Sequence, residues 1–586
     1  MKSLLRLKPY LWKYRRTLFW GLLTVIGSNI FSVAQPQLIG FAIDKLKTGI
    51  ESHNIDTTGL LIYASVVVGL SVAAGIFTFL TRQTIIVVSR HIEFDLRNDF
   101  LGHIQKLSLS YFQNTPTGDL MAHATNDIGA VRNVLGPGIM YPSDTILTFT
   151  FTLVMMFYND WLLTLLVLIP LPLVSYAVYK LSKITHEKFL DRQQQFSLLT
   201  TRAQENLSGI RIVKAYVREE YEIDIFKKMS WEYLKNNLVL ARVQSLIWPL
   251  MFLLVGFSLV IALYVGGLRV IEGAITLGTL TAFFGYLMML IWPMIAFGWV
   301  TNLLQQGAAS MGRLGKIFDT EPDIKDGTET DYTIKDIRGS IEFRGAWFTH
   351  KNAQAPVLKD ITLKIPQGTT LAVVGYTGSG KSTLVNLIPR LYDISEGELL
   401  IDGIPIKKIP LEVLRSNTGY VTQETFLFSD SIHDNIAYGM DNGTLEHVLH
   451  AAEISQIAKD VNDFPKGFET MIGERGITLS GGQKQRTSIA RAVMRNPKIL
   501  ILDDALSAVD TYTEEEILKR LRNVMRDRTS IIISHRISTV KDADMIVVLD
   551  NGMIVERGSH EKLVAKGGIY AELYEKQLLE EELEQL

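Results

Sequence analysis

A glycine-rich run that ends in a lysine and two hydroxyl residues carries the clearest chemistry in the sequence. The run consists of Gly375, Tyr376, Thr377, Gly378, Ser379, Gly380, Lys381, Ser382 and Thr383, and it matches the P-loop pattern in full. Its glycines let the backbone wrap around phosphate oxygens, and a helix that starts there supplies N–H groups and a partial positive charge. We therefore predict a nucleotide site in which Lys381 holds the β- and γ-phosphates and Ser382 binds Mg²⁺.

A carboxylate at the end of an apolar run is the second candidate. Residues 498–502 are mostly apolar and lead directly into Asp503, which is typical of a buried parallel strand. Ligands of α/β sheets bind at the carboxyl ends of such strands, so Asp503 is predicted to hold Mg²⁺. Many buried strands end in Asp, so this pattern alone is a weak sign of a metal site. It becomes a strong one because a P-loop precedes it in the chain.

A third segment could also bind phosphate. It consists of Leu479, Ser480, Gly481, Gly482 and Gln483, and a helical run follows over 487–494. Ser480 suits a helix N-cap, and the glycines would expose the amide groups of the first turn. An ordinary capped helix would explain it if the P-loop were absent. Because one phosphate group does not need two cradles from one chain, we infer that this cradle serves a nucleotide held by another subunit.

These segments lie in the second half of a 586-residue chain whose apolar residues concentrate in the first half. We predict a multi-domain membrane protein: an all-α six-helix transmembrane domain (1–320), a polar linker (321–338) and a C-terminal α/β P-loop ATPase domain (339–586) in which strands and helices alternate. The chain has no cysteine, which excludes a thiol nucleophile and a Cys-based zinc site. The net charge of −2 gives no sign of nucleic-acid binding.

Six apolar segments are long enough to approach the bilayer thickness. They are Thr17–Ile43, Leu60–Leu80, Ile139–Tyr158, Leu162–Tyr179, Ile247–Val270 and Thr279–Thr301. Lys and Arg concentrate over 82–132 and 180–242, whereas the turn at Asn159–Asp160 has neither. The positive excess places both termini and the two long loops in the cytoplasm. Near-helical spacing in these loops predicts helices that extend beyond the bilayer, with turns at 116–119 and near Gly209 and 213–220.

The order of the P-loop, Gln423, the 479–483 segment, Asp503 and His535 resembles the ATP-binding cassette family, and a six-span domain before one cassette resembles its bacterial exporter branch. The resemblance implies two chains that sandwich two ATP molecules, each between one P-loop and the other chain's Leu-Ser-Gly-Gly-Gln segment. The roles it implies are these: Gln423 senses Mg²⁺ and the membrane domain, His535 contacts the γ-phosphate, Asp510 belongs to an inter-subunit loop, residues 473–476 contact the cytoplasmic loops, and coupling helices lie near 113–120 and 213–220.

Two positions depart from the family pattern. The family usually has Glu after the strand-end Asp to polarise the attacking water, and here the residue is Asp504, whose side chain is one methylene shorter. General-base positioning is worth about 10²–10⁴ in rate. We favour a degenerate half whose partner supplies the Glu; the alternative is a homodimer in which Asp504 works slowly. His350 stands where the family usually stacks a Tyr on adenine, and it buries less area there.

The sequence indicates an ATP-driven exporter of hydrophobic or amphipathic compounds in a bacterial inner membrane, with ATP and Mg²⁺ as cofactors and a second half-transporter as partner. A lipid or peptide exporter and an ATP-gated channel are the alternatives. Substrate candidates are Asp144, Met155, Met289 and Trp292. An intramembrane carboxylate is a functional candidate by default, although a position at the membrane interface or an ion pair with Lys or Arg is the simpler interpretation of Asp144. Helix packing or lipid contact is the simpler interpretation of the methionines and of Trp292.

Overall fold

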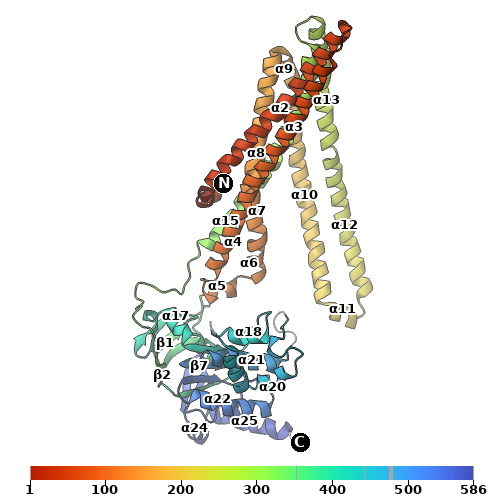
Figure 1. The fold of residues 1–586 in the computed structure, drawn as a ribbon. Helices are drawn as coiled ribbons and strands as arrows, with labels where there is room; N and C mark the ends of the chain where they lie inside the picture. Colours follow the sequence, from red (N-terminus) through yellow and green to blue (C-terminus); the bar gives the residue numbers. More distant parts are fainter. Residues whose placement is uncertain (1, 352, 441–442, 474–478, 585–586) are drawn as a thin grey trace. The chain divides into compact units, whose positions relative to one another are not determined.

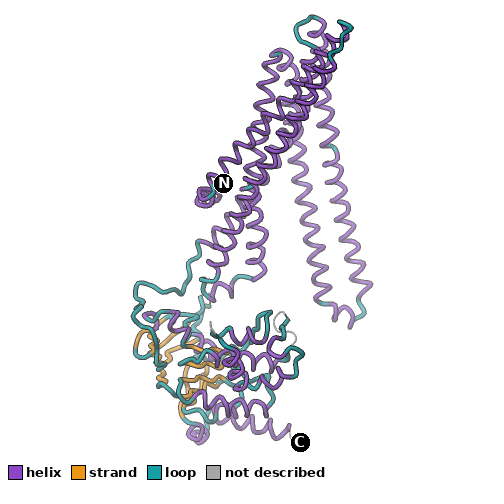
Figure 2. Tube along the Cα trace, in the orientation of Figure 1, coloured by secondary structure: helices purple, strands orange, loops and turns teal. Residues whose placement is uncertain are grey.

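The computed structural model describes residues 2–351, 353–440, 443–473 and 479–584. The chain forms two compact units. The first contains residues 1–104 and 118–320, and the second contains residues 321–586 together with the short segment 105–117. Helices build the first unit, and the strands lie in the second (Figures 1 and 2).

The first unit is a set of long helices. In chain order they are η1 (Lys2–Leu7), α1 (Lys8–Lys13), α2 (Arg15–Glu51), α3 (Thr57–Thr81), the π-helical turn η2 (Arg82–Ile86), α4 (Val87–Ile104), α6 (Thr117–Ala122), the π-helical turn η3 (His123–Asp127), α7 (Ile128–Leu135), α8 (Pro137–Asn159), α9 (Trp161–Leu168), α10 (Pro170–Ser208), α11 (Ile210–Ala215), α12 (Glu219–Ser245), α13 (Ile247–Ile271), α14 (Leu277–Met289) and α15 (Ile291–Phe318).

Four helical segments among the described residues are long and apolar enough to cross a membrane. They are Arg15–Glu51, Thr57–Ile104, Thr117–Asn159 and Leu277–Phe318, and each contains one predicted span. The other two predicted spans coincide with α9–α10 and α13, and Val255–Ile271 within α13 is a shorter apolar helix. The 39 residues of α10 span about 58 Å, roughly twice the hydrocarbon thickness, so this helix extends beyond a bilayer as its polar second half predicts.

Polar side chains fix the ends of several helices. The Asp56 carboxylate accepts a hydrogen bond from the Gly59 N–H (2.7 Å) and caps α3.

The predicted turn at 116–119 is wrong, because α6 already begins at Thr117. Thr115 is extended instead (φ −125°, ψ 116°), as expected for a residue before proline. Residues 115 and 116 thus separate α6 from a short helix before it, α5 (Leu109–Asn114). Most of the coupling helix expected near 113–120 lies after α5.

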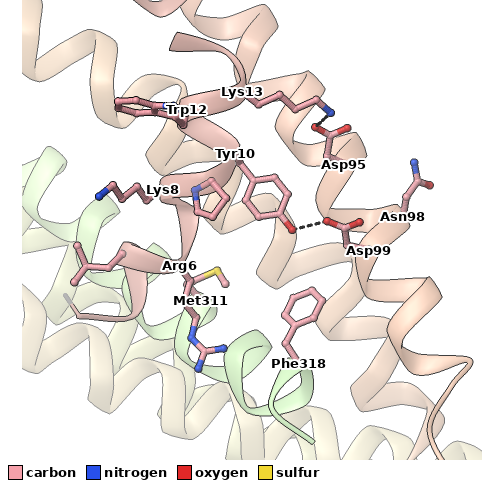
Figure 3. A pocket seen from close by; sticks show the side chains of 12 residues that line it. Arg6, Lys8, Tyr10, Trp12, Lys13, Asp95, Asn98, Asp99, Met311 and Phe318 are labelled. Atoms are coloured by element: carbon pink, nitrogen blue, oxygen red, sulfur yellow. Dashed lines mark hydrogen bonds and ion pairs between the residues drawn. The ribbon is translucent and has the colours of Figure 1, made fainter. Parts of the chain in front are cut away.

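The N-terminal helices η1 and α1 lie against α4 and α15. The Tyr10 hydroxyl donates to Asp99 (2.6 Å), and Lys13 donates to Asp95 (2.7 Å). Between these helices lies a cavity of about 1240 Å³, and Figure 3 shows Tyr10 and Lys13 reaching across to the two carboxylates of α4. Polar bonds thus join α1 to α4, the helix that continues the apolar segment beginning at Thr57.

The second unit contains two sheets. Strands β2, β1, β4 and β5 form an antiparallel sheet in that order, and β9, β3, β8, β7 and β6 form a parallel sheet with β10 antiparallel at the edge of β9. The strands are β1 (Ile341–Phe348), β2 (Leu358–Ile365), β3 (Thr370–Val374), β4 (Glu396–Ile401), β5 (Ile404–Pro405), β6 (Thr418–Val421), β7 (Ile499–Asp503), β8 (Thr529–Ile533), β9 (Met545–Asp550) and β10 (Met553–Gly558). The helices are α16 (Lys381–Asn386), η4 (Ile406–Lys408), α17 (Leu411–Ser416), α18 (Ile432–Ala437), α19 (Leu445–Ile454), α20 (Ile457–Asn462), η5 (Gly467–Glu469), α21 (Gly481–Met494), α22 (Thr511–Met525), α23 (Ile537–Val540), α24 (His560–Lys566) and α25 (Ile569–Glu584).

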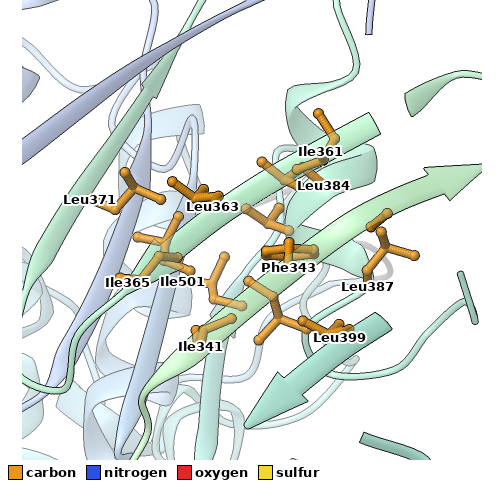
Figure 4. Packing of buried hydrophobic residues seen from close by; sticks show 14 of the residues in the cluster. Ile341, Phe343, Ile361, Leu363, Ile365, Leu371, Leu384, Leu387, Leu399 and Ile501 are labelled. Atoms are coloured by element: carbon orange, nitrogen blue, oxygen red, sulfur yellow. The ribbon is translucent and has the colours of Figure 1, made fainter. Parts of the chain in front are cut away.

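The parallel sheet is buried on both faces. Leu371 and Val373 of β3 join a cluster with the antiparallel sheet and α16, part of which Figure 4 shows. Their neighbours Ala372 and Val374 join a cluster on the opposite face with α21, α22 and α25. This alternation is the side-chain period of a strand that is covered on both sides. Packing on both faces of the sheet fixes the positions of the carboxyl ends of β3 and β7.

Candidate functional site

The P-loop connects β3 to α16 in the structure. An added Cβ on Gly375 would lie 2.1 Å from the Leu549 carbonyl oxygen, so only glycine fits there. Gly380 precedes α16 with φ +100°, a conformation that favours glycine. The Lys381 ammonium donates to the carbonyl oxygens of Gly375 (2.8 Å) and Tyr376 (2.9 Å) and so lies inside the loop that it follows.

This loop fits a phosphate chain. The Ser379 hydroxyl is buried and has no hydrogen-bond partner among the described residues, so it is available to a ligand oxygen. An added Cβ on Gly378 would meet no atom within 4 Å, which leaves that side of the loop open. Burial lowers the pKa of Lys381, while the carboxylates of Asp503 and Asp504 oppose that shift. Bound phosphate would hold the lysine in its charged form.

Asp503 ends β7 beside the loop. Its carboxylate is 3 % exposed and accepts a hydrogen bond from the Ser382 hydroxyl (3.1 Å). Burial raises the pKa of Asp503, and the bond from Ser382 opposes the shift. One hydroxyl and one carboxylate oxygen therefore converge at the end of the phosphate loop, and together with phosphate oxygens they provide the hard ligands that a divalent cation prefers.

The backbone of Asp504 is held on both sides. Its N–H donates to the Ile533 carbonyl (2.9 Å). Its own carbonyl accepts from the Ser507 hydroxyl (3.0 Å) and from the Gln485 side-chain amide (3.4 Å). Its φ is +48°, a left-handed conformation that Asp adopts more readily than most residues. The reach of the Asp504 carboxylate is therefore set by its side-chain length.

Three other predicted residues form no hydrogen bond with the P-loop among the described residues. His535 follows β8, next to β7 in the sheet, and is near enough to influence the titration of Asp503. Gln423 follows β6 on an exposed loop, and its side chain bonds to no P-loop residue among those described. His350 follows β1 and packs edge-on against Tyr392 (5.3 Å between ring centroids, 89°) and against Phe348 (4.8 Å, 82°).

The 479–483 segment forms a capping box at the start of α21. The Ser480 hydroxyl accepts from the Gln483 N–H (3.2 Å), and the Gln483 side chain accepts from the Ser480 N–H (3.0 Å). An added Cβ on Gly482 would lie 2.9 Å from the Ala508 carbonyl oxygen, so the segment packs against the loop after β7. Among the described residues, no hydrogen bond or ion pair joins this segment to the P-loop of the same chain.

Asp510 caps α22 by accepting from the Thr513 N–H (2.9 Å), and this bond lowers its pKa. A structural role therefore explains Asp510 within this chain. Of the residues 473–476, expected to contact the cytoplasmic loops, 474–476 lie outside the described part of the chain.

Sequence reasoning missed two sets of residues. Gln485 is 4 % exposed and holds the loop after β7 through Asp504, Ser507 and the Ala508 N–H (2.9 Å). The segment 105–117 packs with the second unit: the Ser110 hydroxyl donates to Asp323 (2.9 Å), which also pairs with Lys351 (2.9 Å). In both sets the bonded residues lie far apart in the sequence. The only sequence signal for Gln485 was its position two residues after Gln483.

The second set includes a contact with the aromatic group beside His350. Gln113 of α5 bonds to the Tyr392 side chain, and burial raises the pKa of that tyrosine. The short helix α5 is thus tied to the aromatic cluster of residues 348, 350 and 392 by one residue and to the start of the linker by another. The coupling role expected near 113–120, a range that overlaps only the last two residues of α5, stays a prediction.

The substrate candidates occupy different environments in the first unit. Met155 and Met289 pack against the buried cluster around Tyr286, and Trp292 is exposed at the start of α15. The ion pair considered for Asp144 is not found among the described residues, and a position at the membrane interface stays a prediction. Its carboxylate accepts a hydrogen bond from the Asn29 side chain (2.8 Å) and forms no ion pair with a described residue.

Comparison with known proteins decides the family. Residues 18–294 match the family described as ABC transporter transmembrane region, and residues 358–507 match the family described as ABC transporter. The chain belongs to the ABC exporter family. A relative named probable multidrug resistance ABC transporter ATP-binding/permease protein YheI, from Bacillus subtilis, is 39% identical over 560 residues, or 95% of each chain.

Other relatives of this exporter carry different names. The ATP-dependent lipid A-core flippase of Desulfotalea psychrophila is 36% identical and covers 96% of this chain and 97% of its own. A solved structure described as a bacterial Atm1-family ABC exporter with ATP bound is 28% identical, has a TM-score of 0.80, and covers 96% of this chain and 99% of that one. The predicted fold class is confirmed: a helical transmembrane domain precedes an α/β domain that binds and hydrolyses ATP.

Membership in the ABC exporter family also sets the minimal working unit. These exporters function as dimers, and their helices cross a membrane. The P-loop of this chain and its 479–483 segment therefore belong to a machine that needs two ATPase domains. Which chain supplies the second domain is a separate question.

Proposed function

We propose that this chain is one half of a heterodimeric exporter of hydrophobic or amphipathic compounds in a bacterial inner membrane, and that it carries the degenerate ATP site. Lys381, with the loop 375–380, would hold the phosphates, and Ser382 and Asp503 would hold Mg²⁺. Bound MgATP would supply the energy that closes the two ATPase domains on each other. Bacterial relatives named as multidrug transporters support the location and the substrate class.

Asp504 is the observation that carries the proposal. Its backbone is fixed by the bonds to Ile533, Ser507 and Gln485, so the chain cannot advance to compensate for a side chain shorter than Glu by one methylene. A carboxylate about 1.5 Å short of its working position loses about 100-fold or more in rate. A pump with two such sites would turn over too slowly, which favours a partner with Glu at this position.

The exposed arm of the first unit supports the need for a partner chain. Helices α10 and α12 run side by side and are joined through α11, as Figures 1 and 2 show. Leu207, Ile212, Tyr216 and Val217 near the end of this arm are 66–81 % exposed, and a largely apolar groove of about 1290 Å³ lies between the helices. Apolar surface of this extent marks a protein interaction site.

Transport by membrane vesicles tests the proposal. Inside-out vesicles would carry this chain alone, or this chain with a second half-transporter that has Glu at the equivalent of Asp504. We expect ATP-dependent uptake of an amphipathic dye only with both chains present, and loss of uptake with Lys381→Met. Equal uptake by this chain alone would establish the homodimer instead. The absence of uptake by any pair, together with an ion current that persists without turnover, would establish a channel.

A lipid exporter is the second candidate, because a relative named as a lipid A-core flippase is nearly as similar as the multidrug relative (36% against 39% identity). The same vesicles would contain a fluorescent lipid, and its ATP-dependent movement between leaflets would be followed by dithionite quenching. Lipid movement without dye uptake would favour this candidate.

A further inference from the structure

Asp144 lies on α8, in the helical segment Thr117–Asn159 that is long and apolar enough to cross a membrane. It precedes Asn159, the last residue of that helix, by 15 residues, or about 22 Å along the helix axis. The hydrocarbon region is about 30 Å thick. If α8 ends at the outer boundary, the carboxylate lies in the cytoplasmic half of the bilayer, where an unpaired charge is unfavourable.

One oxygen of the carboxylate is held by a fixed donor. The Asn29 side chain of α2 donates to Asp144 Oδ1 (2.8 Å) and to the Val25 carbonyl (3.0 Å). The Thr148 hydroxyl, one turn after Asp144, donates to Asn29 Oδ1. Asn29 is 3 % exposed, so α2 and α8 fix its orientation. No described residue donates a hydrogen bond to Oδ2 of Asp144.

The carboxylate lacks the cation that two other acidic side chains near the membrane-spanning helices have. Asp160 pairs with Arg269 (2.6 Å) at the end of α8, and Asp127 pairs with Arg313 where the helices extend beyond the apolar segments. Among the described residues, no Lys, Arg or His side chain forms an ion pair with Asp144, and its side chain is half-buried rather than sealed. A mobile cation could therefore reach it.

Aromatic and apolar side chains lie within a turn or two of this acid along α8. Tyr141 lies one turn before Asp144 on the same side of α8. Its ring contacts the Trp299 ring of α15 edge-on (5.1 Å between centroids, 82°), and Trp299 is 45 % exposed. Ile139 and Leu147 of α8 pack against the buried cluster of Val25, Ile85 and Met140. A carboxylate beside electron-rich rings and aliphatic side chains suits a large organic cation, because the rings add cation–π attraction and the apolar surface adds burial.

We propose that Asp144 is the cation-binding residue of the substrate site and that this exporter prefers lipophilic organic cations over neutral compounds of the same shape. This inference rests on the proposed export function. Asn29 orients the carboxylate as a positioning residue, and Tyr141 with Trp299 supplies the aromatic wall.

A matched pair of compounds tests the inference. Inside-out vesicles carrying the complex would be given tetraphenylphosphonium, a lipophilic cation, or triphenylphosphine oxide, a neutral relative, with the membrane potential collapsed by valinomycin and K⁺. We expect Asp144→Asn to lower the ratio of cation uptake to neutral uptake at least about tenfold, since one partly desolvated charge pair is removed, and Asp144→Glu to keep most of the ratio. Ser143→Ala is the matched control, because the Ser143 hydroxyl bonds only to the Ile139 carbonyl of its own helix.

The outcomes separate this inference from the function beneath it. An unchanged ratio in Asp144→Asn, or wild-type uptake of the neutral compound alone, overturns the cation site and leaves the exporter intact. Wild-type uptake of neither this pair nor any dye or lipid overturns the exporter as well. A second measurement needs no variant: a hydrophobic carbodiimide should modify Asp144 in the wild-type complex, and tetraphenylphosphonium, but not the neutral relative, should protect it. Equal protection by both compounds would also overturn the inference.

Discussion

Replacing Asp504 by Glu should raise the rate of ATP hydrolysis at the proposed degenerate site of this chain. The backbone at this position is fixed by the Ile533 carbonyl on one side and by Ser507 and Gln485 on the other. The extra methylene therefore advances the carboxylate by about 1.5 Å. Because a misplacement of about 1 Å at a reacting group is worth about 100-fold, we expect the turnover of this site to rise by about that factor.

The same substitution should slightly weaken the fold. The position has φ +48°, and Glu lacks the short polar side chain that eases a left-handed conformation, which amounts to about 1 kcal/mol. The unfolding temperature of the ATPase domain should fall by about 2–4 °C. A gain in turnover despite lower thermal stability would show that side-chain reach, and not general stabilisation, limits the wild-type site.

The assay is ATP hydrolysis by the purified complex in lipid nanodiscs, with the partner's catalytic Glu replaced by Gln so that only this site contributes. Asp504→Asn is the matched control, since it keeps the shape and removes the charge. If Asp504 is already inactive as a base, Asp504→Asn should equal wild type within about twofold. The reasoning is refuted if Asp504→Glu gives no increase while ATP still binds, or if Asp504→Asn abolishes substantial wild-type turnover.

Three further changes follow from the site. Lys381→Met should remove the stabilisation by ATP in thermal-shift assays without lowering the unfolding temperature of the nucleotide-free protein, because burial already disfavours the charged lysine. Since burial lowers the pKa of Lys381 and phosphate needs its charge, wild-type ATP affinity should fall as the pH rises toward the ordinary lysine pKa of about 10.4, and more steeply than in Lys381→Arg; a flat profile would contradict this. Ser480→Ala should destabilise α21 by about 1 kcal/mol, seen as a lower unfolding temperature, while ATP labelling of this chain's own P-loop persists; its loss would mean that the segment acts within the chain. Asp323→Ala should reduce substrate-stimulated hydrolysis only about twofold, because an exposed ion pair contributes little free energy. Unchanged stimulation would exclude a coupling role for Asp323.

Local patterns were the part of the structure that the sequence could predict. The strand–loop–helix order around Lys381 and the apolar run into Asp503 depend on near neighbours, and both have the expected elements. The helix that begins at Thr117 shows the limit of such reasoning. Pro116, Thr117 and Gly118 are typical of a turn, yet proline before a first helical turn is equally compatible with a helix start.

Contacts between distant residues could not be predicted. Asn29 and Asp144 are 115 positions apart, and only the packing of α2 on α8 brings them together. The bonds of Ser110 and Lys351 to Asp323 likewise depend on the segment 105–117 joining the second unit. The sequence shows which chemistry each residue type can perform. Only the tertiary structure shows which hydrogen-bond or ion-pair partner each side chain has.

Retention of the γ-phosphate at this chain's P-loop tests the central claim most directly. The complex with its partner would be incubated with 8-azido-ATP labelled at either the α- or the γ-phosphate for many catalytic cycles and then photolysed, and the label on this chain would be measured. The account predicts that both labels persist equally on this chain and disappear with Lys381→Met. Loss of the γ-label with retention of the α-label would contradict it, because this site would then cleave ATP as a competent half.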